Sequence, residues 1–151
     1  MKSIEGNFDN PEVDELLRKH FIELRSVSPE GSAHVLDIPG LKVSSIKFWS
    51  LWDYNQLIGC GALKFLSDTH GEFKSIRVAD NHRKKGMGEK IISHLIAEAK
   101  KIGIKKLSIE TGAGEFFLPA RKLFSKFGFK KCPPFAHYKE DPNSCYYTLN
   151  L

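Results

Sequence analysis

Apolar residues recur at helical spacing in three separate segments of the chain. In residues 11–26, 87–102 and 115–127 they repeat every three or four positions, so that each segment presents one apolar face. The pattern is clearest in residues 87–102, where apolar side chains cover one half of the helical wheel and mostly charged ones cover the other. Gly103 and Gly128 follow the second and third segments and are typical of helix ends. The pattern therefore predicts three helices.

Five further segments are rich in β-branched and aromatic residues and are bounded by turn-forming residues, as strands are. These segments are residues 46–52, 56–66, 71–79, 105–110 and 144–151. Gly59 and Gly61 lie inside the second of them and predict a bulge or a close approach of the backbone. The strand, helix and strand between residues 71 and 110 form a βαβ unit, whose two strands pair in parallel with a right-handed crossover. We therefore expect an α/β fold, with helices on both faces of one mixed sheet.

The composition is that of a globular chain. The 151 residues are 41% hydrophobic and 27% charged, and this length fits a single domain spanning residues 1–151. No apolar run approaches the length of a membrane-spanning helix, and the first ten residues lack the apolar core of a signal peptide. The three cysteines are widely spaced and form no C-x-x-C pair, which argues against a disulfide framework and a zinc site. We therefore expect a cytoplasmic protein with reduced thiols and no bound metal.

The segment SIRVADNHRKKGMGEK, residues 75–90, joins the end of a strand, a basic loop and the start of a helix. Backbone N–H groups at a helix start are unpaired, and together with the helix dipole they attract anions. Gly86 and Gly88 lack a Cβ and let a phosphate approach the backbone. Three adjacent basic residues add positive charge, namely Arg83, Lys84 and Lys85. The segment therefore predicts a site for a phosphate or pyrophosphate group.

Two common phosphate-binding motifs do not fit this loop. The chain has no G-x-x-x-x-G-K-[ST] sequence, and a third glycine of the dinucleotide motif is missing, since Ile91 stands in its place. The loop does match the Arg/Gln-x-x-Gly-x-Gly/Ala motif of the GNAT superfamily of acyl-CoA-dependent N-acetyltransferases. The matching run is Arg83-Lys84-Lys85-Gly86-Met87-Gly88.

The resemblance to the GNAT superfamily continues on both sides of the loop. Residues 120–124 followed by Phe127-Gly128-Phe129 resemble the family's Ala-x-x-Leu-Tyr helix and Gly-Phe strand start, and residues 57–61 resemble the strand before the cofactor strand. In all, residues 46–151 resemble the family in order and spacing, although Asp80 stands where the family usually has Pro. The phrases FWSLWD, GCGALK and DPNS resemble a bacterial subgroup of acetyltransferases.

The resemblance implies a mostly antiparallel central sheet with one parallel pair of strands that splay apart, and acetyl-CoA as the acyl donor. Its pantetheine would bond the backbone of the cofactor strand, at Ile76, Arg77 and Val78. Its pyrophosphate would lie on the loop amides, at Arg83, Lys84, Lys85, Gly86, Met87 and Gly88. Phe117 takes the place of an Asn that the family often has near pantetheine. Family members commonly form homodimers.

The implied reaction is direct attack of a neutral primary amine on the thioester, which needs a base and an acid. The family's usual acid is a Tyr, but the matching residue here is Phe124, which cannot donate a proton. We therefore name Tyr138 as the candidate acid. Glu72 is the candidate base, because many relatives have a carboxylate at this position, and the rival candidates are Glu110, His70 and His137.

The acceptor is a small molecule or a protein amino group, which the sequence does not distinguish. Residues 27–42, which have room for a short helix, and residues 135–144 are expected to shape its pocket. Two alternative functions remain open. One is a module that binds acyl-CoA without turnover, and the other is a nucleic-acid-binding domain, which is suggested only by the net charge of +5.

Overall fold

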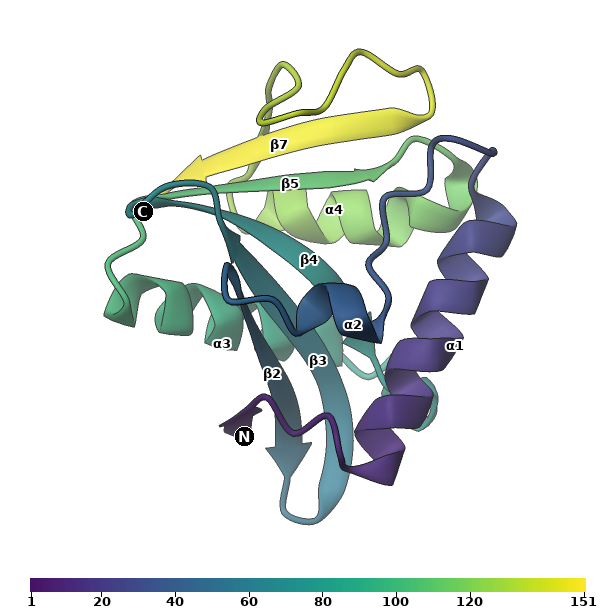
Figure 1. Cartoon of the computed structure of the whole chain (residues 1–151), viewed down its shortest axis with the longest axis vertical. Helices are drawn as coiled ribbons and strands as arrows, with labels where there is room; N and C mark the ends of the chain where they lie inside the picture. Colours follow the sequence, from purple (N-terminus) through teal and green to yellow (C-terminus); the bar gives the residue numbers. More distant parts are fainter.

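The computed structural model describes residues 1–151, which form one seven-stranded sheet flanked by helices (Figure 1). The strands are β1 (Lys2–Glu5), β2 (Ile46–Asp53), β3 (Gln56–Phe65), β4 (His70–Val78), β5 (Lys106–Gly112), β6 (Lys130–Lys131) and β7 (Ser144–Asn150). The helices are α1 (Pro11–Val27), α2 (Ile38–Leu41), α3 (Met87–Lys101) and α4 (Leu118–Lys126), with short 3₁₀ turns η1 (Asp80–His82) and η2 (Glu115–Phe117).

The strand order is β1-β2-β3-β4-β5-β7-β6, and only β4 and β5 pair in parallel. Helices α1 and α2 pack on one face of the sheet, and α3 and α4 pack on the other (Figure 1). Each face has its own apolar core. The core on the α1 face includes Leu16 and Phe48, and the core on the α3 face includes Leu95 and Phe73. The predicted mixed α/β fold, with helices on both faces and a parallel βαβ unit, is confirmed.

Helix α1 starts where its sequence supplies both a cap and an apolar stripe. The Asn10 side chain accepts hydrogen bonds from the backbone N–H groups of Glu12 and Val13, which lack partners within the helix. Val13 and Leu17 are buried against the sheet. The helix therefore packs on the sheet from a capped start, and His20 and Leu24 in its second half line the pocket described below.

Helix α3 lies unusually close to β3, as the two glycines of that strand predict. A Cβ on Gly59 would overlap the carbonyl of Arg77 and the side chain of Ile91. A Cβ on Gly61 would overlap Leu95. The register of β2 against β3 also shifts between Leu51 and Trp52, where Ile58, next to Gly59, is the extra residue of β3, so both a bulge and a close approach are present.

The structure differs from the sequence-based expectations in three short elements. The sequence does not predict strands β1 and β6, because they are edge strands of four and two residues with no alternating apolar pattern. The apolar spacing predicts one helix over residues 115–127, but a 3₁₀ turn precedes α4. Pro119 explains the break, because its ring would clash with a preceding turn of α-helix. In the first turn of a new helix, where Pro119 lies, proline is well tolerated.

No helix in the structure is both long and apolar enough to cross a membrane. Nor do any three His, Cys, Asp or Glu side chains come together in a way that would hold a metal ion.

Candidate active site

The parallel strands β4 and β5 pair at one end only. Their register joins His70 with Lys106, Gly71 with Leu107 and Glu72 with Ser108, and no pairing continues beyond these three positions. From Phe73 onward the two strands diverge, which Figure 1 shows as an opening between them. The predicted splay is therefore present, and it exposes unpaired backbone edges in the middle of the sheet.

A bulge in β4 changes which side chains face this opening. Between the pairs Cys60–Arg77 and Ala62–Lys74, β4 has one residue more than β3, and Ser75 adopts a positive φ of 54°. Phe73 before the bulge and Ile76 after it both pack on the α3 side of the sheet. Lys74 and Ser75 consequently both face the opposite side, where they line a pocket. The bulge thus places two consecutive polar side chains in the cleft.

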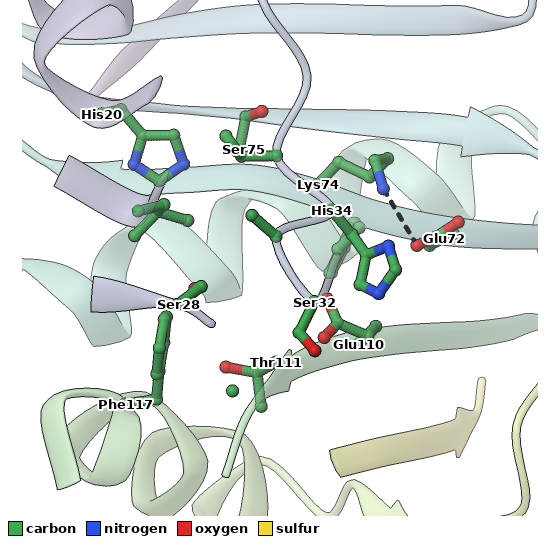
Figure 2. Close-up of a pocket in the computed structure, with 15 residues that line it drawn as sticks. His20, Ser28, Ser32, His34, Glu72, Lys74, Ser75, Glu110, Thr111 and Phe117 are labelled. Carbon is green, nitrogen blue, oxygen red and sulfur yellow. Dashed lines mark hydrogen bonds and ion pairs between the residues drawn. The ribbon is translucent and has the colours of Figure 1, made fainter. Parts of the chain in front are cut away.

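The pocket lies where the strands part, on the side of the sheet that α1 covers (Figure 2). Its lining comes from the end of α1, the segment after it, β4, β5 and the turn before α4. The segment after α1 contributes Ser28, Ser32, Ala33, His34 and Val35 to the lining, and its contact with the acceptor stays a prediction. Residues 135–144 contribute no lining residue, but they brace this segment, because the Ser32 hydroxyl donates a hydrogen bond of 2.7 Å to Asp141.

At the far end of β4, the basic loop leads directly into α3. Gly86 is the N-cap residue with φ of 75°, and no side chain caps the helix start. Lys84 also has a positive φ, of 61°. Lys84 and Lys85 are exposed and pair with no carboxylate, so their charges are free to act on an anion. The open amides at the start of α3 and these two lysines fit the predicted phosphate site.

Two residues of this region have additional structural roles. Gly88 lies against Leu123 of α4, where a Cβ would come within 2.9 Å of a methyl carbon, so close packing of two helices also requires glycine there. Arg83 is already engaged, since its guanidinium lies 3.6 Å from Glu23 of α1 and 3.4 Å from Asp80. The charge of Arg83 is therefore shared with two carboxylates.

The residues predicted to hold pantetheine fall on the expected strand, but their side chains point elsewhere. Ile76 and Val78 pack into the core on the α3 side. Arg77 is buried, and its guanidinium donates to Glu23 at 3.1 Å and to Asp80 at 3.3 Å. Only the backbone of these three residues is therefore available to a ligand, and its contact with pantetheine stays a prediction. Phe117 lines the pocket, with its ring over Gly112.

The two predicted catalytic residues, 66 positions apart in sequence, are in direct contact. The Tyr138 hydroxyl donates a hydrogen bond of 2.5 Å to Glu72 Oε2, and the ammonium of Lys74 lies 3.3 Å from the same oxygen. Lys74 also donates to the Tyr138 oxygen at 3.0 Å. Burial, followed by the Glu72 charge, raises the pKa of the Tyr138 hydroxyl well above its ordinary range. The proton of Tyr138 is therefore held by Glu72, and the role of Tyr138 as an acid stays a prediction.

A second carboxyl group, Glu110 of β5, lines the same pocket (Figure 2). Burial raises its pKa from 4.5 to about 7, although the hydrogen bond from Ser144 and the charge of Lys74 act in the opposite direction. The Ser144 hydroxyl lies 2.8 Å from Glu110 Oε2. Such a carboxyl group exchanges a proton near neutral pH, which is the property of an efficient general base.

The remaining candidates lie outside the pocket lining. His70 is hydrogen-bonded to Ser108 at 2.7 Å, and His137 is exposed and stacks on Tyr138. Phe124, at the position of the family's usual Tyr, is buried in the α3-side core. Of the three rival bases, only Glu110 is thus in the pocket.

Sequence reasoning missed Lys74 and His34 as pocket residues. Lys74 stands two positions after Glu72, which places both side chains on one face of a strand, and this spacing was the available signal. His34 lies in a loop without periodicity, and its contact with Tyr138, at 5.0 Å between ring centroids, depends on tertiary structure alone.

Comparison with known proteins agrees with this geometry. Residues 11–129 match the model of the acetyltransferase (GNAT) family. The uncharacterized N-acetyltransferase YsnE of Bacillus subtilis (strain 168) is 45% identical over 140 residues, which cover 93% of each chain.

Solved structures share the fold at lower identity. A Klebsiella pneumoniae protein assigned to the acyl-CoA N-acyltransferases superposes with a TM-score of 0.80 at 22% identity, covering 99% of this chain and 97% of its own. A GNAT family acetyltransferase from Elizabethkingia anophelis, solved with acetyl-CoA bound, has a TM-score of 0.68 at 20% identity and covers 99% of this chain and 97% of its own. With its parallel splay, its glycine loop and a family match over most of its length, the chain belongs to the GNAT family of acetyltransferases.

Proposed function

We propose that this acetyltransferase transfers the acetyl group of acetyl-CoA directly to the primary amine of a small molecule bound in the pocket between β4 and β5, with Glu110 as the general base. The proposal rests mainly on the properties and position of Glu110. It is a carboxyl group with a pKa of about 7, and it lines a pocket at the point where the two strands part. A small acceptor is favoured because α1 and residues 28–35 wall the pocket on the side away from the sheet.

The donor site follows from the backbone. We propose that pantetheine bonds the free edge of β4 at Ile76–Val78 and that the pyrophosphate lies on the amides from Arg83 to Gly88. The divergence of the strands and the uncapped start of α3 support this placement, as does the acetyl-CoA bound to the Elizabethkingia protein of the same fold. Arg83 would exchange its contacts with Glu23 and Asp80 for the phosphate.

The reaction needs the amine in its neutral form. An aliphatic ammonium has a pKa of about 10, so it must lose a proton before its nitrogen can attack. In our proposal Glu110 accepts this proton, the nitrogen forms a bond to the acetyl carbon, and the carbon–sulfur bond breaks. The second proton lost by the nitrogen ends on the CoA sulfur, so that protons and charge balance.

We assign Glu72 an anchoring role. Its Oε2 is occupied by Tyr138 and Lys74, whereas Oε1 is buried and has no hydrogen-bond partner in the chain. Tyr138 and Lys74 thus fix the carboxylate, and the free oxygen is available to hold the acceptor's ammonium until Glu110 takes its proton. Glu72 as base, our expectation from the sequence, is the alternative against which this assignment is tested.

The Tyr138→Phe variant tests whether Tyr138 acts as the general acid or only orients Glu72. We expect kcat to fall by less than about tenfold and the KM for the amine to rise, because the hydroxyl only orients Glu72. Loss of a hydrogen bond to a charged group is expected to lower stability by about 2 kcal/mol, measured by denaturant unfolding. A fall in kcat of about a hundredfold or more with an unchanged KM for the amine would identify Tyr138 as the acid after all.

The function as a whole is tested by release of free CoA thiol from acetyl-CoA in the presence of a panel of small amines, with the acetylated product identified by mass. If acetyl-CoA raises the melting temperature but no amine releases thiol, the protein is a binding module and the proposal fails.

We propose a cytoplasmic location, because the three cysteines are free thiols and such thiols are typical of that compartment.

A further inference from the structure

Neutral hydrogen-bonding side chains are the largest class among the residues that line the pocket. Fifteen residues line the pocket, and five of them are hydrophobic. Four hydroxyl side chains are distributed along it, from Ser28, Ser32, Ser75 and Thr111 (Figure 2). The Ser32 hydroxyl already donates to Asp141, but burial of a purely hydrocarbon amine would leave the other three hydroxyl groups without partners.

Buried polar atoms without partners lie along the same pocket. His20 Nδ1, Ser75 Oγ and Glu72 Oε1 have no hydrogen-bond partner in the chain, although His20 and Glu72 are only 6% and 1% exposed. Nearly all buried polar groups in proteins are hydrogen-bonded. Glu72 Oε1 is proposed to hold the amine of the acceptor. His20 Nδ1 and Ser75 Oγ need other partners, so the acceptor is expected to present hydrogen-bonding groups besides its nitrogen.

The histidines of the pocket carry no positive charge near neutral pH. Burial lowers the pKa of His20 to about 3, and the charges of Arg77 and Arg83 act in the same direction. Burial and the charge of Lys74 also lower the pKa of His34. Both imidazoles are therefore neutral partners for a ligand.

The one cation that lines the pocket is already balanced. Lys74 is paired with Glu72, and the guanidinium of Arg77 is turned away toward Glu23 and Asp80. With Glu110 ionised, the pocket has one carboxylate in excess, which matches a single ammonium group. No cation remains to balance a carboxylate on the acceptor.

We infer that the acceptor is a small amine that carries neutral hydroxyl groups and no acidic group, as in an amino alcohol or an amino sugar. This inference rests on the proposed function. It places the amine between Glu72 and Glu110, and the hydroxyl groups of the acceptor toward His20, Ser75 and Thr111. An α-amino acid is disfavoured, because its carboxylate would enter a pocket that already has an excess of negative charge.

Three amines of nearly equal size test the inference. They are 2-amino-1,3-propanediol, serine, in which a carboxylate replaces one hydroxymethyl group, and isopropylamine, in which both hydroxyls are absent. The kcat/KM of each is measured by thiol release at pH 7, where all three amines are almost entirely in the ammonium form that the pocket is proposed to bind. We expect the diol to exceed both others by about tenfold or more, since a site built to bond hydroxyl groups rejects analogues that lack them. Glucosamine and its C1 acid extend the comparison to amino sugars.

His20→Leu adds a test within the protein. We expect this variant to raise the KM for the diol several-fold and to leave the KM for isopropylamine unchanged, with circular dichroism as the control for folding. Thr111→Val serves the same purpose and covers the case in which the first variant does not fold. Equal or higher kcat/KM for serine or isopropylamine overturns the inference and leaves the proposed function standing. Thiol release with none of the amines, despite bound acetyl-CoA, overturns both.

Discussion

Replacement of Gly86 with Glu is expected to weaken acetyl-CoA binding by at least about a hundredfold. The added carboxylate would stand at the uncapped start of α3, where the pyrophosphate is proposed to lie, and two like charges about 4 Å apart repel by about 4 kcal/mol near a protein surface. The substitution itself meets open space, because no atom lies within 4 Å of the position that a Cβ would take at Gly86. Binding is measured by titration calorimetry with CoA.

Gly103, at the other end of α3, provides a matched control. It also has a positive φ, of 90°, and open space at the position of a Cβ, so Gly103→Glu imposes a similar backbone strain and the same charge far from the loop. We expect this variant to lose similar stability and to bind CoA normally. Retained CoA affinity in Gly86→Glu, or an equal loss in both variants, would contradict the placement of the phosphate site.

Replacement of Glu110 with Gln is expected to reduce kcat at neutral pH by about 10²- to 10⁴-fold, the usual contribution of a general base. The wild-type kcat/KM is expected to rise with pH through a midpoint near 7, because Glu110 accepts a proton only when ionised and its pKa is about 7. Gln cannot accept the proton, so this limb should be absent. Near pH 10 the acceptor loses its proton without help, and the difference between the two proteins should shrink.

Glu72→Gln makes the same chemical change in the other pocket carboxylate. We expect it mainly to raise the KM for the amine and to keep the limb near pH 7. If Glu72→Gln rather than Glu110→Gln removes the limb, Glu72 is the base, and our assignment is wrong.

Stability gives a readout of Glu110 that is independent of activity. The pKa of Glu110 is raised in the folded protein, so the protonated form favours folding, and this contribution is present below pH 4.5 and lost as pH rises through about 7. Gln resembles the protonated form at every pH. The melting temperature of Glu110→Gln minus that of wild type should therefore increase between pH 5 and pH 8.

The elements on which the donor site depends can be predicted because local patterns encode them. Residues 87–102 have an unbroken apolar stripe, and the run from Arg83 to Gly88 joins charge and glycine at a helix start. Gly59 and Gly61 indicate the close approach of α3 to β3, since each glycine removes a side chain at one point of contact. The stripe and the loop depend on residues within the same short segment, whereas each glycine indicates a contact with a distant helix through the side chain that it lacks.

The acceptor side can be predicted only in part, because its geometry depends on contacts between distant segments. Glu72 and Tyr138 are each candidates from the sequence, but their hydrogen bond depends on how residues 135–144 return over the sheet. The raised pKa of Glu110 results from the burial of its side chain, and the extent of this burial cannot be predicted from the sequence. The pairing of Arg83 with Glu23 likewise joins a loop to a helix 60 residues earlier in the chain.

The short pairing between β4 and β5 has a consequence for the folded state itself. Only three residue pairs join β1–β4 to the remaining strands, so the sheet consists of two halves with a gap between them. A donor molecule bound in the proposed place, along the free edge of β4, would complete the sheet. A ligand that binds only the folded state stabilises it in proportion to the logarithm of its concentration once the site is saturated. The supply of acetyl-CoA would then set the stability of the folded protein as well as its rate of turnover.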